Sequence, residues 1–178
     1  VAILHTAATE TLSLIEGRRA ALPVAKYPTL AEYGCFRALW RHRIAAEFVS
    51  EAEVRSGALE RYRCLFIPYA EALAEDTIRA IVTFVEKDGW LWGETPLAMK
   101  TPVGRAYARF PGGGLEAVFP TALDTWPAWK APVIETPHGE ITSERFVQPL
   151  ETDDDMDPIA FAHGYPVIAE RSIGEGRT

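Results

Sequence analysis

The chain has 178 residues, of which 48% are hydrophobic and 24% are charged, as expected for one globular domain with a sizeable core. Its formal net charge of -7 argues against nucleic acid and anionic lipid as partners, because clusters of lysine and arginine bind both. No apolar run approaches the roughly 20 residues that a membrane-spanning helix needs, and the first residues show no signal-peptide pattern. We therefore expect neither nucleic acid nor a membrane as a partner.

The first strand and the first helix are predicted near the start of the chain. Residues 1–4 (VAIL) form a continuous apolar run, which is typical of a parallel strand buried on both faces. A long loop is expected over residues 5–28. Thr29 and Glu32 have the spacing of a capping box and predict a helix over residues 29–43. One apolar stripe on that helix is expected from Leu30, Tyr33, Phe36, Leu39 and Trp40.

Three more strands are predicted from short apolar runs at residues 45–49, 63–67 and 90–92. Residues 51–57 connect two of these strands, and residues 73–87 form a second amphipathic helix. The alternation of strands and helices predicts parallel strands joined by right-handed crossovers. We expect the strand order 2-1-3-4, which places the first strand inside the sheet.

The second half of the chain loses this alternation. Antiparallel strands are expected within residues 126–150, turning at 137–139. A last strand at 165–172 runs into a turn at 174–176, and a hairpin there needs a partner strand after it.

We interpret residues 1–178 as one α/β domain, with a parallel core over 1–95 and an irregular, β-rich part over 96–178. The valine at position 1, already inside a strand, and the turn at the other end indicate a piece of a longer protein.

The most informative segment is KDGWLWGETP, residues 87–96. A helix ends at its start, a strand follows, and Glu94 and Thr95 stand at the carboxyl end of that strand. Open α/β sheets bind ligands at this edge, and hydrolases and amidotransferases of this kind place a nucleophilic serine or cysteine on the turn. This turn has neither, so the sequence favours a structural or binding domain over an enzyme.

A ligand crevice at the carboxyl edge of the sheet is the best candidate site. Glu94 and Thr95 follow the fourth strand, His5 ends the first, and Glu10 in the long loop is expected to approach Glu94. Two carboxylates beside one crevice permit acid–base chemistry or binding of sugar hydroxyls. The alternative is that Glu94 is a solvated turn residue and that His5 only hydrogen-bonds the loop.

No metal or cofactor is predicted. His42, His138 and His163 are dispersed without the spacing of metal ligands, and the acidic run at residues 153–157 lacks the glycine and glutamate of a calcium loop. The glycine-rich stretch at 111–114 has no lysine at the spacing of a phosphate-binding loop.

The two cysteines, Cys35 and Cys64, are interpreted as buried free thiols. They form no C-x-x-C motif, which leaves zinc and redox chemistry without support. Free thiols fit a reducing compartment and therefore a cytoplasmic protein.

Two tryptophans of the β-rich part, Trp126 and Trp129, are the candidate interface residues. Aromatic side chains are enriched at the centres of protein interfaces. Self-association is expected through this part, roughly residues 126–150, or through the long first loop.

The order of these segments resembles the trimerisation domain of family-42 β-galactosidases. The similar stretches are VAIL at residue 1, FRALWRHRIAAEFVSEAEV from Phe36, YRCLFIPYAEALAEDTIRAIVTFVEKDGWLWGE from Tyr62, PGGGLEAVFP from Pro111 and GYPVIAERSIGEGR from Gly164. The resemblance implies a flavodoxin-like, class I glutamine-amidotransferase-like fold with a β-rich C-terminal addition. It also implies a homo-oligomer whose catalytic residues lie in a separate barrel domain of the same polypeptide.

Three functions remain open from the sequence. The first is a non-catalytic oligomerisation or scaffold domain of a β-galactosidase-like glycoside hydrolase. The second is a small-molecule or sugar-binding module, or an enzyme, that uses the crevice at the strand ends. The third is a sensor domain of amidotransferase-like fold within a multidomain protein.

Overall fold

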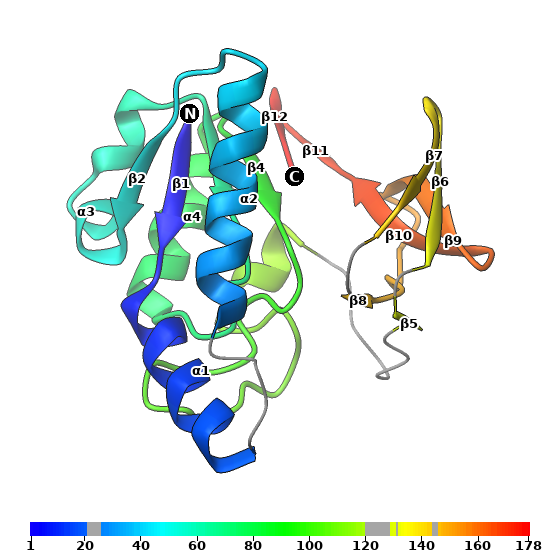
Figure 1. Cartoon of the computed structure of the whole chain (residues 1–178). Coiled ribbons are helices and arrows are strands. Elements are labelled where there is room, and N and C mark those ends of the chain that lie inside the picture. Colours follow the sequence, from blue (N-terminus) through cyan, green and yellow to red (C-terminus); the bar gives the residue numbers. More distant parts are fainter. Residues whose placement is uncertain (21–25, 120–128, 131, 144–145) are drawn as a thin grey trace.

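The computed structural model describes residues 1–20, 26–119, 129–130, 132–143 and 146–178. Beside one two-stranded pair, its described part has two larger sheets of different kinds (Figure 1). The first is mostly parallel and is flanked by helices, and the second is antiparallel and is built from the C-terminal part of the chain. This is the α/β class with a β-rich addition that the sequence predicts.

The parallel sheet contains the four predicted strands in the predicted order. These are β1 (Ala2–His5), β2 (Glu47–Ser50), β3 (Cys64–Ile67) and β4 (Trp90–Gly93). They run parallel in the order β4-β3-β1-β2. The apolar run of β1 is buried because strands pair with it on both sides and helices lie against both faces.

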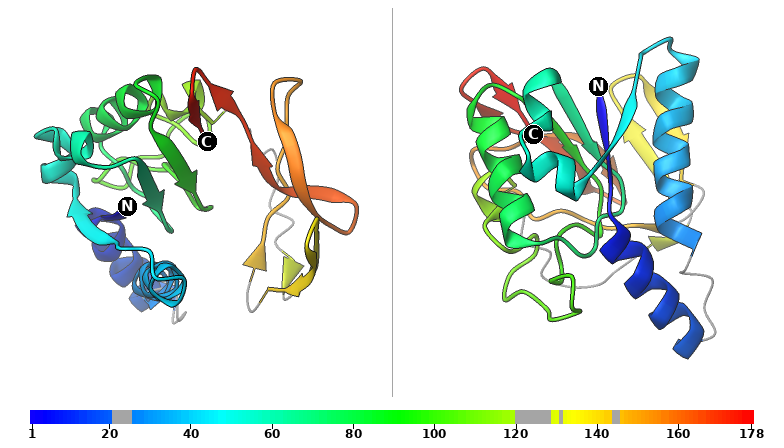
Figure 2. Two further views of the ribbon diagram at one scale, coloured as in Figure 1. Left: turned by 90° about the horizontal axis from the view of Figure 1, so that it is seen from above. Right: turned by 90° about the vertical axis from the view of Figure 1, so that its left-hand side faces the viewer.

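One face of this sheet is covered by α4 (Glu75–Glu86), with α3 (Glu51–Arg55) and η2 (Ala58–Arg61) beside it. Ile78, Ile81 and Val85 of α4 are fully buried against the sheet, as the helical spacing predicts. Figure 2 (right) shows the strands between α4 on one side and α2 (Tyr27–Arg41) on the other. The main core therefore lies between the sheet and α4.

The long loop predicted for residues 5–28 is wrong, because α1 (Ala7–Ala20) occupies most of it. The hydroxyl oxygen of Thr6 accepts a hydrogen bond from the Thr9 amide, 3.3 Å away, and so satisfies one free donor at the helix start. The helix has no regular apolar stripe, which is why periodicity did not reveal it. Glu10 consequently lies on a helix and not in a loop.

The capping box predicted from Thr29 and Glu32 is also wrong. Helix α2 begins at Tyr27, with a proline in its first turn and no side-chain cap. A capping box does form at Ser50 and Glu53, where α3 begins within the stretch predicted as a connection. The Thr29 and Glu32 side chains are instead bonded to Glu10 and His5.

The single apolar stripe predicted for α2 divides into two. Leu39 is buried and Phe36 stacks on Phe48 of β2, with ring centroids 5.6 Å apart. Leu30, Tyr33 and Trp40 face solvent and are 45%, 60% and 70% exposed. Phe36 and Leu39 therefore form the stripe that packs toward the sheet.

The second sheet has four antiparallel strands in the order β10-β9-β6-β7. Their bounds are Val133–Thr136 for β6, Gly139–Thr142 for β7, Asp157–Ala162 for β9 and Tyr165–Glu170 for β10. Its small core contains Ile134, Ala160 and Ala162. The short strands β5 (Trp129–Lys130) and β8 (Phe146–Val147) pair separately, and the helical turn η3 (Leu115–Ala117) precedes this part.

The end of the chain returns to the parallel sheet. Strand β11 (Ser172–Ile173) forms a hairpin with β12 (Gly176–Arg177), and β12 pairs in parallel with β4. The partner strand that the turn at residues 174–176 requires is therefore β12. Asp88 binds this hairpin to the end of α4 by accepting a hydrogen bond from the Glu175 amide, 3.0 Å away. No helix in the described part of the chain has the length and apolar character needed to cross a bilayer.

Candidate functional site

The carboxyl edge of the parallel sheet contains two separate groups of side chains. His5 ends β1 and lies beside Glu10 of α1 and Glu32 of α2. Glu94 and Thr95 follow β4 and line a pocket that none of those three residues lines. Among the described residues, no hydrogen bond or ion pair connects Glu94 with His5 or Glu10. The expected approach of Glu10 to Glu94 stays a prediction.

The first group joins three elements. Nδ1 of His5 lies 3.1 and 3.2 Å from the two carboxylate oxygens of Glu32, and the Thr29 hydroxyl donates to Glu10 at 3.3 Å. Possible ligand atoms of His5, Glu10 and Glu32 lie within 4.8 Å of one another. The sequence does not single out Glu32 as a site residue, because its spacing from Thr29 predicts that its side chain caps the helix.

The charges of this group interact. Burial raises the pKa of Glu32 above its ordinary value, the hydrogen bond and charge of His5 oppose the rise, and the charge of Glu10 adds to it. Two carboxylates thus lie near one imidazole at a partly enclosed position.

The second group lines a pocket of about 370 Å³ between the end of β4 and the antiparallel sheet. Its polar lining residues are Glu94, Thr95, Ser143, Gln148 and Thr178, and its apolar ones include Leu97, Phe119 and Met156. The indole N–H of Trp92 donates to Glu94 at 3.4 Å. A pocket of this size with a few polar groups among apolar ones is typical of a small-molecule site.

Glu94 is open to solvent at one side, but the pocket walls remove water from around its carboxyl. That desolvation raises the pKa of Glu94, and the hydrogen bond from Trp92 partly offsets the rise. A carboxyl that is protonated more readily than usual is able to donate as well as accept hydrogen bonds.

No activated thiol stands near this carboxyl. Burial and the negative charge of Glu94 raise the pKa of Cys35 to about 12, and burial also raises the pKa of Cys64. Since the thiolate is the reactive form, the raised pKa values disfavour the reactive form of both cysteines.

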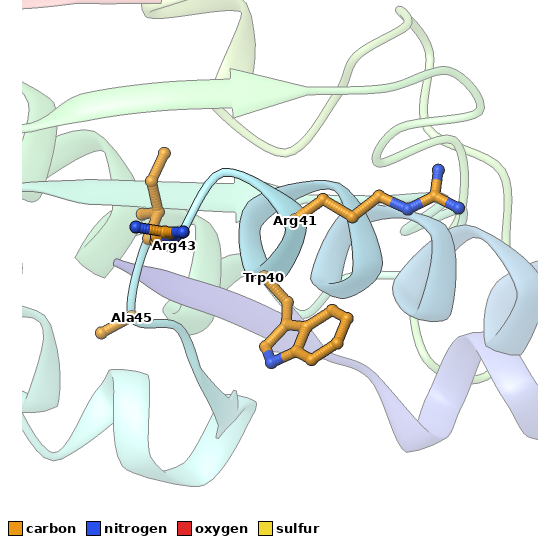
Figure 3. Close-up of a pocket in the computed structure, with 5 residues that line it drawn as sticks. Trp40, Arg41, Arg43 and Ala45 are labelled. Atoms are coloured by element: carbon orange, nitrogen blue, oxygen red, sulfur yellow. The ribbon is translucent and has the colours of Figure 1, made fainter.

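A third feature is the outer stripe of α2, which we define as Leu30, Tyr33, Trp40 and Ile44. These residues follow one another at helical spacing and continue into the turn after the helix. Ile44 is 44% exposed and Trp40 borders an open hollow lined by Arg41, Arg43, Ile44 and Ala45 (Figure 3). Sequence periodicity predicted Leu30, Tyr33 and Trp40 on one stripe with Phe36 and Leu39, and did not separate the exposed residues from the inner ones.

The two predicted interface tryptophans are not both described by the structure. Trp126 lies outside the described residues. Trp129 lies in β5, whose backbone pairs with β8 in antiparallel register.

The comparisons with known proteins rest on structure and not on sequence. No protein-family model matches the chain, and no curated protein matches its sequence. Solved β-galactosidases match over nearly the whole chain. Gan42B, a GH42 β-galactosidase from G. stearothermophilus, aligns with a TM-score of 0.79 at 16% identity over 99% of this chain and 26% of its own. The chain has the fold of one segment of these enzymes.

Two further β-galactosidases agree with this result. The enzyme of the Antarctic haloarchaeon Halorubrum lacusprofundi aligns with a TM-score of 0.76 at 16% identity, over 99% of this chain and 26% of its own. The β-galactosidase of the psychrophilic Marinomonas ef1 aligns with a TM-score of 0.76 at 15% identity, over 99% of this chain and 25% of its own. The chain spans about a quarter of the length of the β-galactosidases it matches. The likeness includes the β-rich part, so the two sheets recur together in these enzymes.

Proposed function

We propose that this chain is a non-catalytic domain of a β-galactosidase-like glycoside hydrolase and that it holds subunits of that enzyme together. The observation on which the proposal rests is the outer stripe of α2, an apolar surface with no partner among the described residues of the chain. The likeness to one quarter of several β-galactosidases supports a multidomain parent, whose catalytic barrel belongs to the same polypeptide.

The composition of this surface supports an interface. Tyr33 and Trp40 are among the most exposed large hydrophobic side chains of the described chain, and Arg41 and Arg43 stand beside Trp40. Tryptophan, tyrosine and arginine are the residues that most often dominate binding energy in protein interfaces. Solvent contact with such a stripe is unfavourable, and burial against a second subunit removes it.

The proposal of a non-catalytic role rests on the chemistry of the strand ends. The turn at Gly93, Glu94 and Thr95 has no serine or cysteine, and burial holds the thiols of Cys35 and Cys64 in the protonated form. An amidotransferase-like ancestry of the fold is compatible with this loss of the nucleophile. Half-buried free cysteines also suit the reducing cytoplasm, which we propose as the location.

The test is the oligomeric state of the complete polypeptide, measured by sedimentation across a range of concentrations. Trp40→Ala should weaken self-association by about 2 kcal/mol, which is about thirtyfold in the dissociation constant, if Trp40 is a central interface residue. Val103→Ala is the matched control, because Val103 is an exposed apolar side chain outside the stripe, 89% open to solvent. An unchanged dissociation constant for Trp40→Ala and for Tyr33→Ser would remove α2 from the interface.

The same experiment separates α2 from the β-rich part. We keep Trp126 and Trp129 as proposed interface residues of that part. If Trp126→Ala or Trp129→Ala weakens association while Trp40→Ala does not, the interface lies there. A polypeptide that stays monomeric at micromolar concentration with and without these changes would contradict the oligomerisation role altogether.

A second candidate function is favoured by the pocket beside Glu94. Its volume of about 370 Å³ and its mixture of a carboxyl with hydroxyl and amide groups suit a small polyol or a sugar. Titration with galactose, followed by NMR chemical shifts of the tryptophan indole groups, tests this role. Binding that Glu94→Gln weakens would support it, and the absence of shifts at millimolar sugar would contradict it.

A further inference from the structure

The His5, Glu10 and Glu32 side chains form a cluster that neither the oligomerisation role nor the pocket beside Glu94 uses. They come from the end of β1, from α1 and from α2. Parallel sheets bind ligands at this edge, because the strands end there and the following segments diverge. The cluster therefore lies where ligand sites of such sheets are found, and it contains both nitrogen and oxygen donors.

The distances suit a shared cation. Nδ1 of His5 is 3.1 and 3.2 Å from the oxygens of Glu32, and possible ligand atoms of all three residues lie within 4.8 Å of one another. Two ligands on one tetrahedral zinc ion, at bond lengths of about 2.0–2.2 Å, lie about 3.3–3.6 Å apart. The His5–Glu32 separation is near that spacing, and the Glu10 carboxylate supplies the third donor.

The charges favour a cation as well. Among the described side chains, no lysine or arginine forms an ion pair with Glu10 or Glu32, whereas Glu16 and Glu71 are both paired with Lys100. Among the described residues, His5 pairs with Glu32, and the Thr29 hydroxyl donates to Glu10. Side-chain relative exposures of 13% for Glu32 and 38% for His5 leave the group partly enclosed but accessible to an ion.

We propose that His5, Glu10 and Glu32 bind a divalent transition-metal ion, with Zn²⁺ as the best match and water completing its coordination. One imidazole and two carboxylates suit Zn²⁺ or Mn²⁺, whereas Ca²⁺ and Mg²⁺ prefer oxygen donors alone. The Thr29 hydroxyl, 3.3 Å from Oε1 of Glu10, orients that carboxylate from outside the site. The bound ion joins α1 and α2 to the end of β1.

Glu10 distinguishes a metal site from a simple ion pair between His5 and Glu32. In the ion-pair case Glu10 only repels Glu32, so its removal leaves the pair intact or strengthens it. In the metal case Glu10 is a ligand, so its removal weakens binding. Glu10→Gln therefore decides between them.

The experiment uses the 178-residue chain with any affinity tag removed, Zn²⁺ in calorimetric titration, and Co²⁺ as a spectroscopic probe. We expect one Zn²⁺ per chain and visible Co²⁺ absorption bands that Zn²⁺ abolishes. His5→Gln, Glu10→Gln and Glu32→Gln should each weaken Zn²⁺ binding at least about tenfold. Circular dichroism establishes that each variant is folded.

The controls are His42→Gln and Glu86→Gln, which change exposed residues of the same types outside the cluster. Both should bind Zn²⁺ like the original chain. The proposal is overturned if the folded chain binds neither ion at millimolar concentration, or if Glu10→Gln binds Zn²⁺ as tightly as the original chain. A failure here leaves the oligomerisation proposal untouched, because none of the three cluster residues belongs to the outer stripe of α2.

Discussion

Thr9 of α1 and Ala72 exchange two hydrogen bonds in the interior. The Ala72 amide donates to Oγ1 of Thr9 at 3.0 Å, and the Thr9 hydroxyl donates back to the Ala72 carbonyl at 3.1 Å. Both residues are at most 1% exposed. One hydroxyl thus satisfies the donor and the acceptor of a buried peptide group and fixes α1 to the segment after β3.

Thr9→Val should therefore destabilise the chain more than its small change of shape suggests. Valine fills the same space but leaves the Ala72 amide and carbonyl without partners, at a cost of about 2–4 kcal/mol in the free energy of unfolding. Thr9→Ser keeps the hydroxyl and should cost only about 1 kcal/mol for the lost methyl group. Urea denaturation of both variants is the measurement, and equal losses would show that the hydrogen bonds do not matter.

Two glycines should respond to alanine in opposite directions. Gly34 lies within α2, and an added Cβ would meet no atom within 4 Å. Because glycine is unfavourable inside a helix, Gly34→Ala should stabilise the chain by about 0.5–1 kcal/mol.

At Gly176 of β12, a Cβ would lie 2.8 Å from the carbonyl oxygens of Val85 and Gly89. Both obstacles are backbone atoms, so Gly176→Ala should displace β12 from β4 and lower the thermal midpoint. Thermal unfolding of the two variants side by side tests the pair. A Gly176→Ala chain as stable as the original would mean that β12 contributes little to the sheet.

Glu94 should make the stability of the chain depend on pH. Its pKa is raised in the folded state, chiefly by desolvation, so ionisation penalises the folded form relative to the unfolded chain. The penalty is absent below the ordinary glutamate pKa of about 4.3 and grows as the pH rises through the folded value.

Glu94→Gln removes that penalty because glutamine does not ionise, and its side-chain oxygen still accepts from Trp92. The variant should match the original chain at low pH and become the more stable of the two as the pH rises to neutrality. Thermal midpoints over this range are the measurement, with Glu86→Gln as an exposed control. A variant less stable than the original at neutral pH would show that the charge of Glu94 is favourable in the fold.

The purified chain should show no glutaminase and no galactosidase turnover. It has no serine or cysteine at the turn after β4, and burial holds the thiol of Cys35 protonated, with a pKa of about 12. Assays with glutamine and with chromogenic galactosides are the measurement. Turnover that Glu94→Gln abolishes would refute this and identify the pocket as an active site.

The parallel core could be predicted from the sequence because its signals are local. The apolar runs of β1 and β3 and the helical spacing of Ile78, Ile81 and Val85 each report burial directly. Alternating strands and helices are compatible with only a few topologies, so the order of the four strands could be predicted too. The absence of a nucleophile after β4 was also visible, since it depends on residue types alone.

Helix α1 was missed because tertiary contacts hold it in place. Thr9 binds Ala72, and Glu16 pairs with Lys100 at 2.7 Å, so its attachment relies on polar contacts with distant segments and not on an apolar stripe. The same helix brings Glu10 to His5 and Glu32, three residues whose separation in the chain shows no metal-binding pattern.

Helix α2 shows which features the sequence determines and which depend on the tertiary structure. Its spacing determined that Leu30, Tyr33, Phe36, Leu39 and Trp40 belong to one amphipathic helix. Only the tertiary structure decided that Phe36 and Leu39 face the sheet while Leu30, Tyr33 and Trp40 face solvent. Periodicity specifies which residues share a side of a helix, but the neighbours of that helix specify which side is covered. The sequence therefore determined the elements and the parallel core, and the packing decided which side chains are available for binding.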